Sequence, residues 1–238
     1  MIKIENVETV GWKSAIRGMR NPKNSWGLSD SGECRAGDTG IDCKSCSSKP
    51  CGHSIDHSFN LGNNDIKLMS QLAAAGPTHR KYLRMIVVYM DVTAPLYWWK
   101  EFDTYKVGTV ANSCSTMHKI HDKVFTIDDF SHEHLEKASM NLMNDMVKAL
   151  NVCRDMFLES DKKDKEMWYQ MIQLLPTSYN QKRTVMLNYE VLANIYANRR
   201  KHKLDEWRDF CKWIETLPNK KLILTSAEIF DGSRRIEV

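Results

Sequence analysis

Residue types that bind metal ions gather in the first quarter of the chain. Two residues separate Cys43 from Cys46, a spacing that lets two thiolates bind the same tetrahedral ion. Zinc suits sulfur and nitrogen donors, and a bound ion would order a segment that has little apolar sequence of its own. The pattern leaves two interpretations open, a zinc site or a loop of reduced cysteines. The candidate zinc ligands are Cys34, Cys43, Cys46, Cys51 and His53.

A second candidate site is the small and polar run of residues 109–116. Its hydroxyl and amide groups could bind a polar ligand, and its backbone could approach a phosphate closely. The alternative is an ordinary loop rich in serine and threonine. The residues that could contact a ligand here are Thr109, Asn112, Ser113 and Thr116.

Two basic clusters could also contact a ligand. His79 precedes Arg80 and Lys81 where a helix is expected to turn into a strand, and Arg199 lies in a polar run at the expected end of a helix. Cations at that end stabilise the helix dipole, whereas a guanidinium group also binds phosphate through two parallel hydrogen bonds. The residues alone favour the helix-end role for Arg199 and a surface role for the first cluster.

Hydrophobic periodicity predicts the elements that must position these groups. Apolar patterns typical of strands occur at residues 2–10, 83–92, 183–187 and 222–224. Helical patterns occur at 12–19, 65–75, 131–160, 163–175, 189–200 and 204–217, with Ser131 as the expected cap of the longest helix. We therefore expect an α+β fold, a mixed sheet flanked by helices, in a single domain over residues 1–238 with a Cys/His-rich insertion at about 21–63.

Composition excludes several classes of protein. The chain has 238 residues, of which 42% are apolar and 27% charged, with a net charge of +4. That charge is too mild for a protein that coats nucleic acid, so a nucleic-acid partner is not expected. No run of apolar residues is long enough for a membrane span, and the first residues lack the pattern of a secretory signal. Seven cysteines without such a signal favour reduced thiols or a metal site, so we expect a cytoplasmic protein, encoded by a cell or a phage.

Two blocks of sequence resemble the flavin-dependent thymidylate synthases. Ala94-Pro95-Leu96-Tyr97 is similar to the family's strand end, and the segment that follows aligns with its substrate-binding helix. The second block begins with Leu175-Pro176 and carries four further matches. Together the blocks cover under half of the chain. The matching residues of the second block are Asn188, Leu192, Asn194 and Arg199.

The resemblance implies a mixed α/β domain that assembles as a homotetramer with active sites between subunits. It implies FAD as cofactor, NADPH and methylenetetrahydrofolate as reductant and carbon donor, and the conversion of dUMP to dTMP. It assigns Asn188 and Asn194 to the flavin, and His79 to the flavin or the folate. It assigns Arg199 and the residues of 109–116 to the nucleotide.

The chain departs from that family at several charged positions. Thr104-Tyr105-Lys106 replaces an Arg-His-Arg triplet, and Thr116 replaces a later arginine. Each lost arginine removes hydrogen bonds to a charged group that are worth about 1.5–3 kcal/mol. Binding of dUMP in the family's manner is therefore in question, and so is methyl transfer.

Three hypotheses follow from this mixture of matches and departures. The first is a divergent flavoenzyme of nucleotide metabolism with Lys106, Cys114 and Ser115 as catalytic candidates, because a thiolate such as that of Cys114 can add to a pyrimidine ring. The second is a protein that binds a nucleotide in the same place without catalysing a reaction. The third is an interaction protein whose cysteine-rich segment is held by zinc.

Overall fold

Four antiparallel strands form the central sheet of the computed structural model, which describes residues 2–33, 59–230 and 232. The strand order is β1-β4-β6-β5, and every neighbouring pair is antiparallel. The α+β class is confirmed, whereas the expected mixed sheet is wrong, because no local pattern in the sequence reveals the direction of a strand. The strands are β1 (Lys3–Val10), β4 (Val87–Pro95), β5 (Val110–Ser113) and β6 (Asn180–Asn188).

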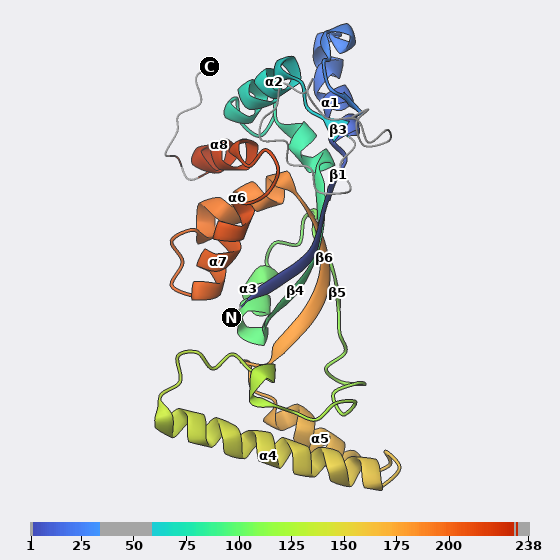
Figure 1. Ribbon diagram of the computed structural model, residues 1–238, viewed down its shortest axis with the longest axis vertical. Helices are drawn as coiled ribbons and strands as arrows, with labels where there is room; N and C mark the ends of the chain where they lie inside the picture. Colours follow the sequence, from blue (N-terminus) through green and yellow to red (C-terminus); the bar gives the residue numbers. More distant parts are fainter. Residues whose placement is uncertain (1, 34–58, 231, 233–238) are drawn as a thin grey trace, which may run out of the picture.

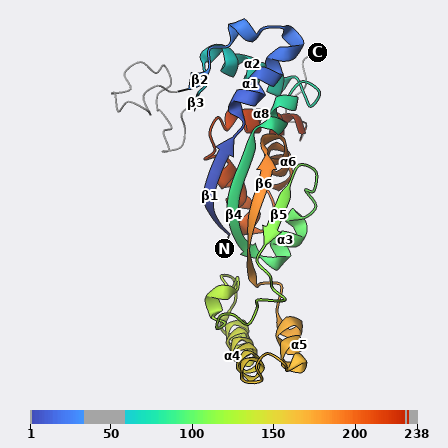
Figure 2. The ribbon, with the colours of Figure 1, turned by 90° about the vertical axis from the view of Figure 1, so that its right-hand side faces the viewer.

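Helices α3, α6, α7 and α8 lie on one side of this sheet (Figure 1), and Figure 2 looks onto the opposite face, with the strands in front of the helices. The alternation along β4 agrees with this arrangement. Met90 and Val92 point into the core and are buried, whereas Tyr89 is 40% exposed. The α-helices are α1 (Trp12–Arg20), α2 (Asn63–Ala74), α3 (Leu96–Phe102), α4 (Lys137–Glu159), α5 (Lys165–Leu174), α6 (Tyr189–Arg199), α7 (Asp205–Ile214) and α8 (Lys221–Phe230).

Aromatic side chains hold α3 and α7 together beneath the sheet. Trp98, Trp99 and Trp207 are fully buried. The ring centroids of Trp98 and Trp207 are 4.7 Å apart, and Phe102 stacks on Trp98 at 5.0 Å. Such ring pairs add to the free energy gained from burial alone. The C-terminal end of α3 is therefore fixed against α7, and the polar side chains that follow it are fixed with it.

Helices α4 and α5 form an arm beyond one end of the sheet (Figure 1). The arm has an apolar core of its own, in which Leu150, Phe157 and Met171 are buried. The long helix begins at Lys137 and not at the expected Ser131, whose backbone N–H instead donates to Ser178 O at 2.8 Å. No helix within the described ranges combines the length and the apolar composition that crossing a membrane requires.

Three other expected boundaries differ from the structure. Residues 81–85 form a 3₁₀ helix, so the expected strand at 83–92 begins only at Val87. The expected loop at 109–116 contains β5, and the expected strand at 222–224 lies inside α8. Short apolar runs do not separate strands from helices by periodicity, and α8 buries Leu222, Ile223 and Ala227 at helical spacing. The 3₁₀ helices are η1 (Asn21–Lys23), η2 (Trp26–Leu28), η3 (Lys81–Met85) and η4 (Ile127–Asp129).

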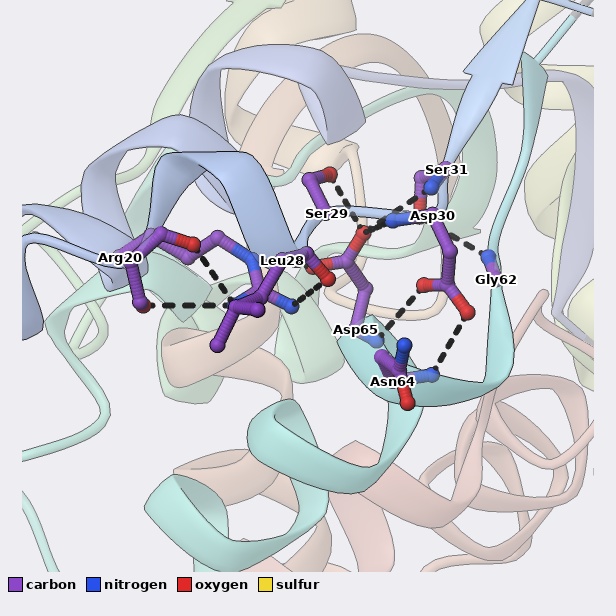
Figure 3. A network of polar contacts seen from close by, with 9 residues as sticks. Arg20, Leu28, Ser29, Asp30, Ser31, Gly62, Asn64 and Asp65 are labelled. Carbon is purple, nitrogen blue, oxygen red and sulfur yellow. Dashed lines mark hydrogen bonds and ion pairs between the residues drawn. The ribbon is translucent and has the colours of Figure 1, made fainter.

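A buried ion pair closes the base of the expected insertion (Figure 3). Arg20 Nε lies 2.6 Å from Asp65 Oδ1, with the two side chains 4% and 0% exposed. Asp65 Oδ2 accepts hydrogen bonds from the Ser29 hydroxyl and from the backbone N–H of Asp30 and Ser31. Beyond this network two short strands pair, β2 (Gly32–Glu33) with β3 (Phe59–Asn60).

The five candidate zinc ligands fall outside the described residues. Cys34, Cys43, Cys46, Cys51 and His53 all lie between β2 and β3, in residues 34–58. Among the residues that the structure describes, no three His, Cys, Asp or Glu side chains form a group that could hold a metal ion. The zinc site stays a prediction.

Candidate functional site

The segment that follows α3 lies along helix α6, although about 90 residues separate them in the sequence. At one end Asn188 Nδ2 donates to Gly108 O over a long 3.5 Å. At the other end Arg199 Nε donates to the Tyr105 hydroxyl at 3.0 Å. We call this contact zone, residues 101–109 against Asn188–Arg199, the α6 seam. Because α6 rises 1.5 Å per residue, the seam is about 16 Å long.

Asn188 is positioned by the beginning of α6. Its Oδ1 accepts the backbone N–H of Val191 at 3.1 Å and so caps the helix. The side-chain N–H₂ group is thereby directed at Gly108. Gly108 has φ +79°, and a Cβ atom there would lie only 2.7 Å from Asn188 Nδ2. A glycine is therefore required both for the backbone conformation and for the close approach.

Thr109 adds an unsatisfied oxygen next to this glycine. Its Oγ1 is buried and has no hydrogen-bond partner among the described atoms. Buried hydroxyl groups are normally hydrogen-bonded, so this oxygen fits a contact with a ligand or a bound water. The neighbouring Lys106 is exposed. Lys106 and Thr109 thus offer a cation and a hydroxyl group within four residues of chain, and Asn188 adds an amide beside Gly108.

The other end of the seam is a cluster of charges around Glu101. Arg199 Nη1 lies 2.6 Å from Glu101 Oε2, and the same oxygen accepts Trp207 Nε1 at 3.0 Å. His202 Nε2 lies 3.4 Å from it. The guanidinium group of Arg199 also lies 4.8 Å above the ring of Trp207. The charge of Arg199 is therefore paired inside the chain.

The polar run after Thr109 is an edge strand and a turn. All four residues of β5 are exposed, and Val110 faces Met186 of β6. The backbone of Cys114 is held on both sides, because its N–H donates to Lys182 O at 2.9 Å and its C=O accepts from the side-chain amide of Gln181 at 3.0 Å. Asn112 and Ser113 belong to β5 itself, so they present alternate faces of the sheet edge.

The catalytic candidates Cys114 and Ser115 lie at the far end of β5 from the seam. The four residues of β5 separate Thr109 from Cys114, and these five residue steps of nearly extended chain span about 16 Å. Cys114 is exposed, and the Ser115 hydroxyl accepts the backbone N–H of His118 at 2.9 Å within a turn. Thr116 is half-buried in the same turn. No described contact joins these residues to Asn188 or Arg199 within one chain.

His79 and Asn194 occupy different positions around α6. His79 is exposed on the turn before η3, whereas its neighbour Arg80 is fully buried and forms an ion pair with Glu190 at 3.0 Å. The expected surface role of this basic cluster is thus wrong for Arg80, which anchors the first turn of α6. Asn194 lies midway along the helix and accepts a hydrogen bond from Asn198 Nδ2 at 2.7 Å.

The outer face of the sheet carries a separate polar cluster around Asp91. Thr184 Oγ1, Asn6 Nδ2 and Lys182 Nζ contact its carboxylate at 2.7, 2.9 and 3.0 Å. The hydrogen bonds from Thr184, Asn6 and Lys182 lower the pKa of Asp91 to about 2. These contacts connect Asp91 of β4 to Asn6 of β1 and to Thr184 and Lys182 of β6 across the sheet.

Sequence reasoning did not bring Glu101, Trp207 and His202 together, although Glu101 and His202 lie in two separate candidate segments and Trp207 lies near the end of the second block of the resemblance. No motif joins them, because they come from α3, α7 and the turn between α6 and α7. The pairing of Glu101 with Arg199 joins positions 98 residues apart. Only the packing of α3 against α7 reveals that these side chains converge.

Comparisons with known proteins relate the chain by fold alone. No family model and no curated protein sequence matches it. A crystal structure of thymidylate synthase X (ThyX) from Helicobacter pylori with FAD and dUMP superposes with a TM-score of 0.62 and 15% identity, over 96% of this chain and 100% of that chain. A second structure of the H. pylori enzyme, also complexed with FAD and dUMP, gives a TM-score of 0.59 and 16% identity over 93% and 98%. The chain therefore shares the fold of these flavin-dependent thymidylate synthases.

Proposed function

We propose that this protein is a divergent relative of the flavin-dependent thymidylate synthases that binds FAD, a dUMP-like pyrimidine nucleotide, or both, along the α6 seam. The observation that carries the proposal is the meeting of residues 101–109 with both ends of α6, through Asn188 and Gly108 and through Arg199 and Tyr105. The shared fold supports it, because the neighbouring structures hold FAD and dUMP.

The side chains of the seam fit a flat heterocycle better than a phosphate. The amide of Asn188 and the unpaired hydroxyl oxygen of Thr109 are neutral hydrogen-bonding groups, which suit the edge of a flavin or a pyrimidine. Lys106 is an exposed cation near them, whereas Arg199 already has an anionic partner. We expect His79, Asn188 and Asn194 to hold the flavin.

The nucleotide would lie over the other candidate residues. We expect Thr109, Asn112, Ser113 and Thr116 to contact it, and Arg199 to reach it only when Glu101 releases the guanidinium group. FAD in this place would supply hydride transfer, with NADPH as the reductant and methylenetetrahydrofolate as the carbon donor. No step of that chemistry is visible in the contacts of the single chain.

An active enzyme would need a second copy of the chain. Lys106 is at the seam, but Cys114 and Ser115 lie about 16 Å away along β5. A neighbouring subunit could bring the exposed end of one β5 to the seam of another, so we propose a homo-oligomer, a tetramer by analogy of fold. We also propose that the protein works in the cytoplasm.

The second candidate function is nucleotide binding without a reaction. The observation that favours it is the Glu101–Arg199 ion pair, since an arginine neutralised by the chain itself contributes little to holding a dianionic phosphate. Such a protein would sense or sequester a nucleotide. Turnover of dUMP by the purified protein with FAD, NADPH and methylenetetrahydrofolate separates the two candidates.

Binding is tested by titrating FAD and dUMP into the purified protein and following flavin absorbance and the melting temperature. The matched pair of variants is Asn188→Ser, which keeps a helix cap but removes the amide donor, and Asn141→Ser, at an exposed position of α4 in the distant arm. We expect Asn188→Ser to weaken binding about tenfold, the effect of about 1.4 kcal/mol, and Asn141→Ser to leave it unchanged. A protein whose absorbance and melting temperature respond to neither ligand would refute the proposal.

A further inference from the structure

We propose that Glu101 is a built-in anion that occupies an oxyanion-binding site formed by Arg199, Trp207 and His202, and that a free phosphate group binds there only by displacing it. Two N–H groups donate to one oxygen, Glu101 Oε2, from 2.6 Å (Arg199) and 3.0 Å (Trp207), and His202 Nε2 lies 3.4 Å from the same oxygen. Convergent donors of this kind are what a carboxylate or phosphate oxygen requires.

Each donor is held in place by contacts other than Glu101. Arg199 Nε donates to the Tyr105 hydroxyl, and its guanidinium plane rests on the ring of Trp207. The backbone N–H of Leu204 donates to His202 Nδ1 at 3.2 Å, which leaves the proton of a neutral imidazole on Nε2, facing Glu101. The donors are therefore arranged for an anion by their own surroundings.

Removing the Glu101 carboxylate would leave the buried indole N–H of Trp207 without a hydrogen-bond acceptor. Its side chain is fully buried, and its indole N–H can only donate. If the carboxylate of Glu101 left, this N–H would need another acceptor, because an unsatisfied buried donor destabilises the protein. An external oxyanion would satisfy Trp207 and neutralise Arg199 at once.

The link of Glu101 to the chain gives its carboxylate an advantage over free phosphate in the unchanged protein. A group linked to its binding site through a short flexible connection has an effective concentration on the order of mM. Glu101 is 35% exposed at its side chain, so a route from solvent to the donors exists. Phosphate well below mM concentration would lose this competition, whereas the removal of the carboxylate would free the donors.

A second ion pair in the same segment provides the control. Asp103 contacts Arg183 Nη1 at 2.8 Å, and that guanidinium lies 4.2 Å above the ring of Trp99. Asp103, Arg183 and Trp99 therefore combine the same three groups as the Glu101 cluster: a carboxylate, an arginine and an aromatic ring. The difference is that the indole N–H of Trp99 donates to Gln181 O and not to the carboxylate. Removing Asp103 should therefore not create a convergent site.

The test measures the binding of inorganic phosphate by calorimetry at constant ionic strength. The variants are Glu101→Ala, the nearly isosteric Glu101→Gln, Asp103→Ala and the double variant Glu101→Ala/Arg199→Ala, each checked for folding by circular dichroism. We expect Glu101→Ala to bind phosphate at least tenfold more tightly than the unchanged protein, and Glu101→Gln to show a smaller gain. The gain should vanish in the double variant, and Asp103→Ala should behave as the unchanged protein.

Two results would overturn the inference. One is equal phosphate affinity in the unchanged protein and in whichever Glu101 variant folds. The other is a gain that persists without Arg199. The inference does not depend on a flavin or a pyrimidine, so its failure would leave the Asn188 titration standing, and failure of that titration would leave this experiment informative.

Discussion

Arg199 and Glu101 form an ion pair of 2.6 Å across 98 residues of sequence, and this pair joins the end of α6 to the end of α3. The side chains are 19% and 35% exposed, so the pair is neither free in solvent nor fully buried. The Glu101 carboxylate has a second partner, the indole N–H of the buried Trp207, which belongs to α7. Three helices thus meet at one carboxylate oxygen, which fixes the position of the segment that leads to Gly108.

Replacing Arg199 should expose the contribution of this pair to stability. We expect Arg199→Met to lower the free energy of unfolding by about 1–2 kcal/mol, the worth of a hydrogen bond to a charged group reduced by solvent screening. The double variant Arg199→Met/Glu101→Gln should recover part of that loss, because it leaves no unpaired carboxylate. Urea denaturation of the two single variants and the double variant measures the coupling. Additive losses would show that the two side chains do not interact.

Gly108 should not tolerate a side chain. Gly108→Ala places a Cβ atom 2.7 Å from Asn188 Nδ2 in a left-handed backbone conformation of φ +79°, which costs about 1–2 kcal/mol for an alanine. We expect a lower melting temperature and weaker binding of FAD or dUMP. Gly27→Ala is the control, since a Cβ atom there meets nothing within 4 Å. Equal melting temperatures and equal ligand affinities in the two variants would contradict the close approach of Gly108 to Asn188.

The Arg20–Asp65 pair should dominate the stability of the region around α2. Both side chains are buried, so Arg20→Met leaves an uncompensated carboxylate and should cost about 3–5 kcal/mol. Lys3→Met removes a partner from the exposed pair with Glu5 and should cost less than about 1 kcal/mol. Chemical denaturation of both variants measures the two losses in the free energy of unfolding. A small loss for Arg20→Met would mean that the hydrogen bonds from Ser29, Asp30 and Ser31 are enough to stabilise the Asp65 carboxylate.

The cluster around Asp91 should make stability depend on pH in acid. The hydrogen bonds from Thr184, Asn6 and Lys182 hold the pKa of Asp91 at about 2 in the folded protein, below its ordinary 3.8. The contribution of Asp91 to the free energy of unfolding is therefore fully present above pH 3.8 and is lost as the pH falls through about 2. We expect the acid slope of unfolding free energy to be shallower in Asp91→Asn. An unchanged slope between these pH values would contradict this assignment.

The sequence predicted helices well where apolar residues repeat over two or more turns. Helices α1, α2, α5 and α6 lie within two residues of their expected bounds. Prediction from the sequence failed where the structure of a segment depends on its contacts with distant parts of the chain. The run of residues 222–224 is too short to distinguish a strand from the buried α8, and the polar residues of β5 form a strand only because β6 supplies the partner backbone.

The candidate site could be predicted in part. The resemblance assigned Asn188 to the flavin and Arg199 to the nucleotide, and the structure brings these residues into contact with Gly108 and Tyr105. Their ligand-binding roles stay a prediction. The sequence could not show that Glu101 neutralises Arg199, since nothing in a linear pattern pairs residues of α3 and α6. Nor could it show that Cys114 lies beyond β5.

Hydrogen exchange measured with and without saturating FAD and dUMP tests the central claim most directly. If a ligand binds along the α6 seam, backbone amides in residues 105–113 and 188–199 should exchange more slowly together when it is present, and those of α4 in the distant arm should not change. Slower exchange confined to other segments, or no change at ligand concentrations that saturate binding, would show that the seam is not the site.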